Sequence, residues 1–132
     1  MFTPQEANEA LVHLRPRVER LVRRRRELVR LTTRLESVRA KVAGNGGRFD
    51  PGRVNELREQ AESIAADLAE LVEEIHGLGV QVKDLDLGLV DFPAEHPESG
   101  ETVLLCWRLG EDEVAYWHGL EEGFAGRKPL PF

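Results

Sequence analysis

Cysteine is nearly absent from the sequence, which holds Cys106 alone among its 132 residues. A single thiol excludes a disulfide within the chain and fits a reducing compartment. Apolar runs are short, and none approaches the length that crosses a bilayer. The first residues, Met1–Glu6, lack the basic and apolar regions of a secretion signal, so we expect them to begin a helix. These absences predict a cytoplasmic protein without a membrane segment.

Motifs with an established catalytic or metal-binding spacing are missing too. The four histidines include no His-Glu-x-x-His pair, and a single cysteine cannot form a paired zinc motif. No glycine-rich loop stands between an expected strand and an expected helix, which argues against a nucleotide site of known type. The sequence therefore favours a binding or scaffold role over an enzyme, and it leaves any cofactor unidentified.

Two long helices are predicted for the first part of the chain. Thr3 as N-cap, Pro4 as the first helical residue and Glu6 three positions after the cap form a capping box. Apolar residues then recur at helical spacing as far as the glycines at 44–47, which end the helix. Pro16 lies inside this pattern, and we expect it to kink or break the helix one turn earlier.

The second helix is expected to begin at Asp50, with Pro51 as its first helical residue. Its apolar side chains alternate in steps of three and four from Val54 to Leu78, as in the seam of a coiled coil. The two helices are therefore predicted to form an antiparallel hairpin. Residues 4–15 would extend beyond the second helix and pack on the segment that follows it.

Charge is unevenly distributed, although the net value is only −6. Residues 1–48 hold 12 basic and 5 acidic side chains, whereas residues 49–79 hold 2 basic and 8 acidic ones. We expect these charges to be matched across the hairpin, because opposite pairs select partner and direction in coiled coils. A turn near residue 47 would place Arg20 beside Glu74.

The arginine run Arg23–Arg26 raises the alternative of an anionic partner such as a nucleic acid. Four consecutive helical residues point in different directions, however, and no aromatic residue stands among them. A solvated, salt-paired helix is therefore the favoured interpretation.

The last part of the chain is predicted to be rich in strands. Glu111 and Asp112 are expected at the tip of a tight hairpin, whose register sets Cys106 beside Trp117 and leaves His118 on the opposite face. The fold class is therefore α+β, with a long antiparallel, coiled-coil-like helical hairpin and a small three- to four-stranded antiparallel sheet. The expected strands cover residues 80–83, 88–92, 102–109 and 113–118.

Two regions are expected, a helical hairpin over residues 1–79 and a β-rich part over residues 80–132, packed together as one domain. Their most distinctive strings are Phe2–Asn8, Gly88–Pro93, Leu105–Glu111, Trp117–His118 and Gly123–Arg127. Together these strings resemble the signature of a bacterial family filed as domain of unknown function 2203. The resemblance spans nearly the whole chain and implies a bacterial, cytosolic, single-domain protein. It implies no activity, cofactor or catalytic residue.

The expected sheet holds the candidate residues of a ligand site, which are Asp91, Trp117, His118 and Arg127. His118 follows Trp117 at the end of one strand, Asp91 ends another, and Arg127 follows a glycine-rich stretch. A histidine with carboxylates can hold a transition metal, so His118 and Asp91 are candidate ligands, with Glu121–Glu122 close by in the sequence. The alternative is that His118 simply donates a hydrogen bond to Asp91 or to the backbone.

Arg127 and Cys106 each allow two interpretations. Arg127 is suited to bind a carboxylate or phosphate group through two parallel hydrogen bonds, and the alternative is an ion pair with one of the many acids in this half of the chain, such as Asp84 or Asp86. Cys106 is interpreted as a small buried residue, because the expected register leaves no base beside it to activate a nucleophile.

An apolar line on the first helix predicts an oligomer. Leu11, Val18, Val22 and Val29 run beside the line that faces the second helix, and one neighbouring helix does not cover both. We therefore expect a homodimer with this line at its interface. The leading hypothesis is a non-enzymatic, homodimeric interaction or scaffold protein. The alternatives are a protein that binds a metal or small anion on the C-terminal sheet, and one that binds an anionic partner or nucleic acid through the first helix.

Overall fold

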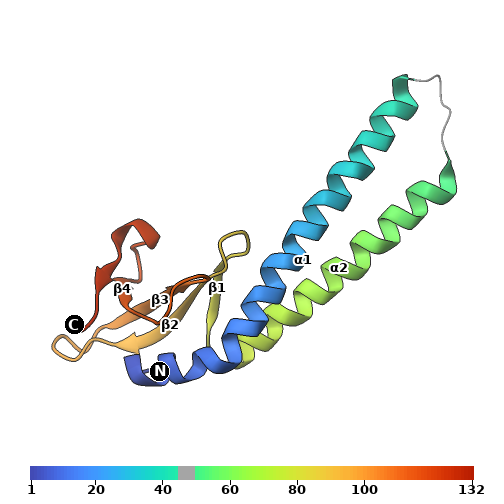
Figure 1. Cartoon of the computed structure of the whole chain (residues 1–132). Helices are drawn as coiled ribbons and strands as arrows, with labels where there is room; N and C mark the ends of the chain where they lie inside the picture. Colours follow the sequence, from blue (N-terminus) through green and yellow to red (C-terminus); the bar gives the residue numbers. More distant parts are fainter. Residues whose placement is uncertain (45–49) are drawn as a thin grey trace.

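The computed structural model describes residues 1–44 and 50–132. Two long helices form a hairpin, and five strands form one antiparallel sheet beside its open end (Figure 1). The α+β class is therefore confirmed, with one strand more than expected. The elements are α1 (Pro4–Gly44), α2 (Pro51–Gly77), β1 (Gln81–Asp84), β2 (Leu89–Glu95), β3 (Thr102–Arg108), β4 (Tyr116–Gly119), the 3₁₀ helix η1 (Phe124–Gly126) and β5 (Lys128–Pro129).

Helix α1 begins with the expected capping box. The Thr3 N–H donates to Glu6 Oε1 at 3.0 Å, and the Glu6 N–H donates to Thr3 Oγ1 at 3.1 Å. Of the two expected effects of Pro16, a kink or a break, the break does not occur, since α1 continues through Pro16 as one helix. Figure 1 shows the kink, because the N-terminal part of α1, drawn in blue, turns away from the axis of the rest. The predicted stop falls mostly on residues 45–49, which lie outside the described chain.

Helix α2 begins and ends where its sequence predicts. Asp50 is the N-cap, and its side chain accepts hydrogen bonds from the Gly52 and Arg53 N–H groups. Beyond the last turn, Gly79 adopts a positive φ of 85°, which favours glycine. The coiled-coil seam is also present, because the buried residues of α2 fall on it: Val54, Leu57, Leu68, Leu71 and Ile75.

Ion pairs connect the two helices, but not in the expected register. Arg17 lies 3.4 Å from Glu74, and both Arg20 and Arg24 contact Asp67, at 3.1 and 2.7 Å. Arg20 thus pairs about two turns of α2 away from its expected partner, Glu74. The prediction paired residues symmetrically about the turn, which assumes that neither helix is shifted along its axis relative to the other.

Strands follow one another in the sheet in chain order, from β1 to β5. Between β3 and β4, Leu104 lies opposite His118 and Cys106 lies opposite Tyr116. The predicted neighbour of Cys106 was Trp117, so the predicted register was wrong by one residue. Because side chains alternate along a strand, this single step moves His118 onto the same face as Cys106.

The loop between β3 and β4 explains the error. It spans residues 109–115, and is not the two-residue tip that the sequence indicated. The Glu111 N–H donates to the Arg108 carbonyl at 3.0 Å, and Trp107 Nε1 donates to the Glu111 carbonyl at 3.1 Å. These bonds close a wider turn with an odd number of residues, which shifts the pairing by one.

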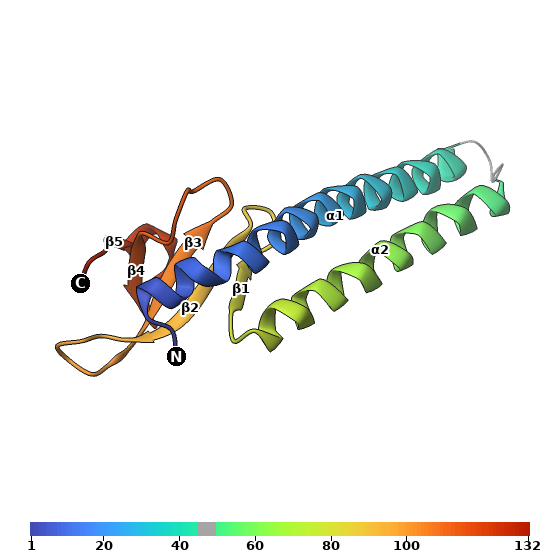
Figure 2. The same ribbon diagram turned by 60° about the horizontal axis from the view of Figure 1, so that its bottom comes forward.

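The main hydrophobic core lies between one face of the sheet and the helices. Alternate residues of β2 and β3 point to this face, where they meet the apolar side of α1. Figures 1 and 2 both show the N-terminal part of α1 alongside the sheet. The largest fully buried side chains of this core include Leu14, Val18, Leu21, Ile75, Phe92, Leu105 and Trp107.

The first turns of α1 are tied to the sheet region by polar contacts as well. Asn8 Oδ1 accepts from the Val114 N–H at 2.7 Å, and Asn8 Nδ2 donates to the Val114 carbonyl at 3.3 Å. Arg15 donates to the Glu111 carbonyl at 3.3 Å. Residues 4–15 therefore pack on the segment after α2, as expected.

The residues expected at a dimer interface mostly lie in this core instead. Leu11, Val18 and Val22 are 4%, 0% and 4% exposed, whereas Val29 is 42% exposed. Gly88, in the turn between β1 and β2, lies so close that an added Cβ would sit 3.0 Å from a methyl group of Val18 and of Val22. The chain's own sheet thus supplies the cover that we expected from a second copy.

Candidate functional site

Three neighbouring strands bring a carboxylate, a thiol and an imidazole together on the sheet face that does not carry the main core. Asp91 comes from β2, Cys106 from β3 and His118 from β4. Asp91 and Cys106 are direct partners across the ladder. All three are buried, at 1%, 0% and 3% exposure, and their potential ligand atoms lie within 4.8 Å of one another. We refer to these residues as the Asp-Cys-His cluster.

His118 is held by a hydrogen bond at each ring nitrogen. Nδ1 lies 2.8 Å from the Gly119 carbonyl oxygen, and Nε2 lies 3.1 Å from Asp91 Oδ2. A carbonyl can only accept, so Nδ1 carries a proton in this contact. Because Nδ1 is directed at the Gly119 carbonyl, Nε2 is the ring nitrogen that faces Asp91 and the rest of the cluster. In protein metal sites, a bond from the outer ring nitrogen to a backbone carbonyl orients the inner nitrogen in the same way.

Asp91 has one carboxylate oxygen without a partner. Its Oδ2 contacts His118, but Oδ1 is buried and accepts no hydrogen bond from any group in residues 1–44 or 50–132. Buried polar atoms are nearly always paired, because water no longer solvates them. The free oxygen belongs to the same carboxylate that faces Cys106 and His118, so the cluster has an unused acceptor.

Cys106 is a poor nucleophile in this setting. Burial is the main factor that raises the pKa of its thiol, and with the nearby Asp91 carboxylate it brings that pKa to about 12. At neutral pH the side chain is therefore a thiol, whereas a catalytic cysteine needs a thiolate. A bound cation would reverse this preference, since a coordinating thiol loses its proton.

Sequence reasoning did not assign Cys106 to this site. The missed signal was the length of the loop after β3, because a one-residue change in register decides whether Cys106 shares a face with His118 or with Trp117. The two predicted metal ligands, Asp91 and His118, do lie together. Their contact also matches the alternative interpretation, in which the pair is a plain hydrogen bond.

Arg127 lies near the cluster but is already paired. Its guanidinium donates to both carboxylate oxygens of Glu111, at 2.9 and 2.7 Å. The guanidinium carbon also lies 3.9 Å from the centre of the Tyr116 ring and 4.6 Å from that of Phe124. Arg127 therefore forms the ion pair that was expected as its alternative role, with Glu111 as the acidic partner and not Asp84 or Asp86, which were named as examples.

Trp117 does not join the other candidate ligands. It points to the opposite sheet face, where its ring packs 5.2 Å from His96 and 5.3 Å from Phe132 between centroids. Glu122 is also occupied, because its side chain accepts from the Gly119 N–H at 3.0 Å and from Lys128 at 3.2 Å. These two bonds, the backbone one first, lower the pKa of Glu122.

The protein is an α+β protein, in which a helical hairpin precedes an antiparallel sheet that carries a buried Asp-Cys-His cluster. Over residues 1–130 the chain matches the family described as an uncharacterized conserved protein (DUF2203), and it belongs to that family. Comparison with curated proteins and with solved structures found no match. None of the helices in the described parts of the chain is long and apolar enough to cross a membrane.

Proposed function

We propose that this protein binds one divalent transition metal ion, zinc above all, through Asp91, Cys106 and His118. The observation that carries the proposal is the convergence of three different ligand types, buried and within 4.8 Å of one another. Thiolate, imidazole and carboxylate are the three side-chain groups that bind zinc in proteins. Three protein ligands also leave a fourth position for water or another molecule, as in zinc sites that do chemistry.

Charge balance supports a dication at this place. One aspartate carboxylate and one cysteine thiolate carry two negative charges, and the histidine is neutral when it binds a metal. A doubly charged cation would therefore make a neutral assembly, which is the form that a buried site tolerates best. It would also engage Oδ1 of Asp91, which is buried and accepts no hydrogen bond from the described residues.

Cobalt substitution tests the proposal directly. The protein is purified without a histidine tag, stripped with a chelator under reducing conditions, and titrated with Co²⁺. We expect one equivalent to bind and to give a thiolate-to-cobalt charge-transfer band. The variant Cys106→Ser should lose this band, and His118→Gln should lose stoichiometric binding. The control His13→Gln changes an exposed histidine of α1 and should bind as the wild type does.

Thermal unfolding separates metal binding from a purely structural Asp91–His118 contact. A metal that binds only the folded state stabilises it by about 2.7 kcal/mol at a free concentration 100 times the dissociation constant. We expect Zn²⁺ to raise the unfolding temperature of the wild type and not that of Cys106→Ser. If neither Zn²⁺ nor Co²⁺ shifts unfolding or binds stoichiometrically, the cluster is structural and the proposal fails.

A homodimeric scaffold role is a second proposal, and a cytoplasmic location in a bacterium is proposed with it. The scaffold role is supported by the length of chain in the hairpin, 41 residues in α1 and 27 in α2, much of which lies beyond the sheet. A free thiol also fits a reducing cytoplasm. Sedimentation equilibrium at micromolar concentration tests the dimer, and a single monomeric species would exclude it.

Nucleic-acid binding through α1 has less support, because Arg20, Arg24 and Arg25 form ion pairs.

A further inference from the structure

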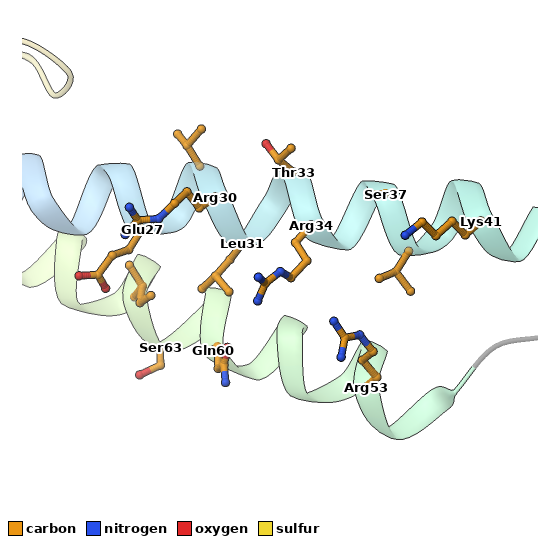
Figure 3. A pocket seen from close by; sticks show the side chains of 13 residues that line it. Glu27, Arg30, Leu31, Thr33, Arg34, Ser37, Lys41, Arg53, Gln60 and Ser63 are labelled. Carbon is orange, nitrogen blue, oxygen red and sulfur yellow. The ribbon is translucent and has the colours of Figure 1, made fainter.

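A groove runs between α1 and α2 in the part of the hairpin that lies away from the sheet (Figure 3). Its volume is about 930 Å³, and it follows α1 from Glu27 to Lys41. At 1.5 Å per residue this stretch is about 21 Å long. The groove shares no lining residue with the Asp-Cys-His cluster, so binding in it would be independent of metal binding.

The groove has apolar residues that the hairpin leaves partly uncovered. Leu31 and Val38 of α1 and Ile64 of α2 are half-buried, and Val29 is exposed. Nearer the sheet, by contrast, Leu21 of α1 is fully buried. The seam of the distal hairpin therefore offers apolar surface that a further element would cover.

Positive charge surrounds this apolar strip. Arg30, Arg34 and Lys41 line the groove from α1, and Arg53 lines it from α2. Figure 3 shows the side chains of Arg34 and Arg53 pointing into the gap between the helices. Like charges on the two helices repel each other across the gap. An anionic occupant would convert that repulsion into attraction.

The groove holds little negative charge to balance these side chains. Glu27 is its one acidic lining residue, and Glu27 already contacts Arg24 at 2.9 Å. Within the described ranges, 1–44 and 50–132, none of the four lining cations forms an ion pair. Nearer the sheet the pattern is opposite, because Asp67 of α2 there binds two arginines of α1. The cations that line the groove thus outnumber its one lining carboxylate.

We propose that this groove docks an acidic amphipathic helix from a different protein. Apolar side chains at helical spacing would cover Leu31, Val38 and Ile64, and flanking carboxylates would meet Arg34 and Arg53. Such helix-in-groove binding uses an apolar stripe with charged flanks. The length of the groove suits about four turns of helix.

Other occupants fit the groove less well. Single-stranded nucleic acid is bound with stacking aromatic side chains, and none of the 13 lining residues is aromatic. A small molecule is normally enclosed on most sides, whereas this groove is open to solvent. A second copy could offer the acidic α2, but the exposed residues of α2 include no large apolar side chain to fill the strip.

A synthetic peptide tests the proposal with the full-length protein. The probe is a fluorescein-labelled peptide of about 15 residues, with leucines at helical spacing and glutamates beside them. We expect saturable binding, seen as fluorescence anisotropy, that weakens as salt is raised. A peptide in which lysine replaces every glutamate should not bind. A scrambled peptide of the same composition should bind at least about tenfold more weakly, which corresponds to 1.4 kcal/mol.

Charge reversal locates the binding surface. The double variant Arg34→Glu and Arg53→Glu, one change on each helix, should weaken peptide binding by about tenfold or more, equivalent to 1.4 kcal/mol. The matched control, Arg26→Glu with Arg58→Glu, makes the same charge change at exposed positions outside the groove and should bind normally. Circular dichroism checks that both variants keep their helices, and the neutral variant Arg34→Gln with Arg53→Gln should show an intermediate loss.

Several outcomes would overturn the proposal. These are no saturable peptide binding, equal binding of the scrambled peptide, and equal loss in both double variants. Displacement of the peptide by an oligothymidylate would assign the groove to nucleic acid. A dimer that dissociates only in the groove variant would assign it to a second copy.

Discussion

Asp91 and His118 meet across an intervening strand. Their side chains are 3.1 Å apart, Oδ2 to Nε2, although β3 separates the strands that carry them. Two residues of β3 lie beside this contact, Cys106, which pairs with Asp91 in the ladder, and Leu104, which lies opposite His118. The Cys106 thiol lies within 4.8 Å of both partners, so the thiol and the contact belong to one arrangement.

This contact predicts a strong stability coupling in the metal-free protein. His118→Leu should lower the free energy of unfolding by about 3 kcal/mol, because it leaves the Asp91 carboxylate buried without its partner. Asp91→Val in the same background should recover much of that loss, since apolar replacement of both members of a buried pair is often neutral. Urea unfolding with a chelator present measures the cycle, and simple addition of the two single effects would contradict it.

A steric prediction concerns Gly88. It adopts a φ of +66°, and an added Cβ would lie 2.8 Å from Leu109 and 3.0 Å from Val18 and Val22. Gly88→Ala should therefore cost about 2–4 kcal/mol, from both backbone strain and overpacking. Gly110→Ala is the control, because Gly110 also has a positive φ but open space around it, so only about 1–2 kcal/mol should be lost. Equal losses, measured by urea unfolding, would mean that the close packing at Gly88 is unimportant.

The ion-pair cluster of the hairpin predicts an acid response. The hydrogen bond from Arg20, followed by that from Arg24, lowers the pKa of the Asp67 carboxyl. A carboxyl with a lowered folded pKa stabilises the fold above its unfolded pKa, and this contribution is lost as pH falls through the folded pKa. Asp67→Asn should therefore be less stable than the wild type at neutral pH, and the difference should shrink in acid.

Glu62→Gln provides the comparison for this acid response. Glu62 is exposed on the same helix and forms no ion pair with the described residues. Its variant should keep the wild-type acid profile in urea unfolding measured at several pH values. A gap between Asp67→Asn and the wild type that stays constant into acid would show that the ion pairs contribute nothing to stability.

Thiol chemistry offers a further test of the structure. Cys106 is 0% exposed, and burial raises the pKa of its thiol to about 12. Iodoacetamide attacks thiolates, so the native metal-free protein should stay unmodified at mildly alkaline pH. Urea should release one reactive thiol per chain, detected by mass spectrometry. Rapid labelling of the native protein would show that the sheet face opens easily.

The sequence predicted the helices and strands of this fold better than it predicted which residues of neighbouring elements lie opposite one another. The caps at Thr3 and Asp50 are local signals, because a hydroxyl or carboxylate oxygen satisfies free N–H groups within three residues. The docking of residues 4–15 followed from counting helix lengths. The offset between the helices did not, since it depends on how side chains of both helices interlock.

In the candidate site, too, local signals were predicted from the sequence, whereas contacts between elements were not. Asp91 and His118 were identified by residue type and by their places at strand ends. Cys106 was missed because its neighbours depend on whether the loop after Arg108 has an even or odd number of residues. Hydrogen bonds from Trp107 and Glu111 decide that number. Such contacts arise in three dimensions and leave no periodic trace in the chain.

The hydrogen bonds between Asn8 and Val114 join residues 106 positions apart. The strands, in contrast, pair with their neighbours in chain order. On the ribosome, the first turns of α1 therefore leave the exit tunnel long before their docking surface has been synthesised. The contacts of Asn8 cannot form until the loop that carries Val114 has emerged, so this turn of α1 is made long before it finds its place.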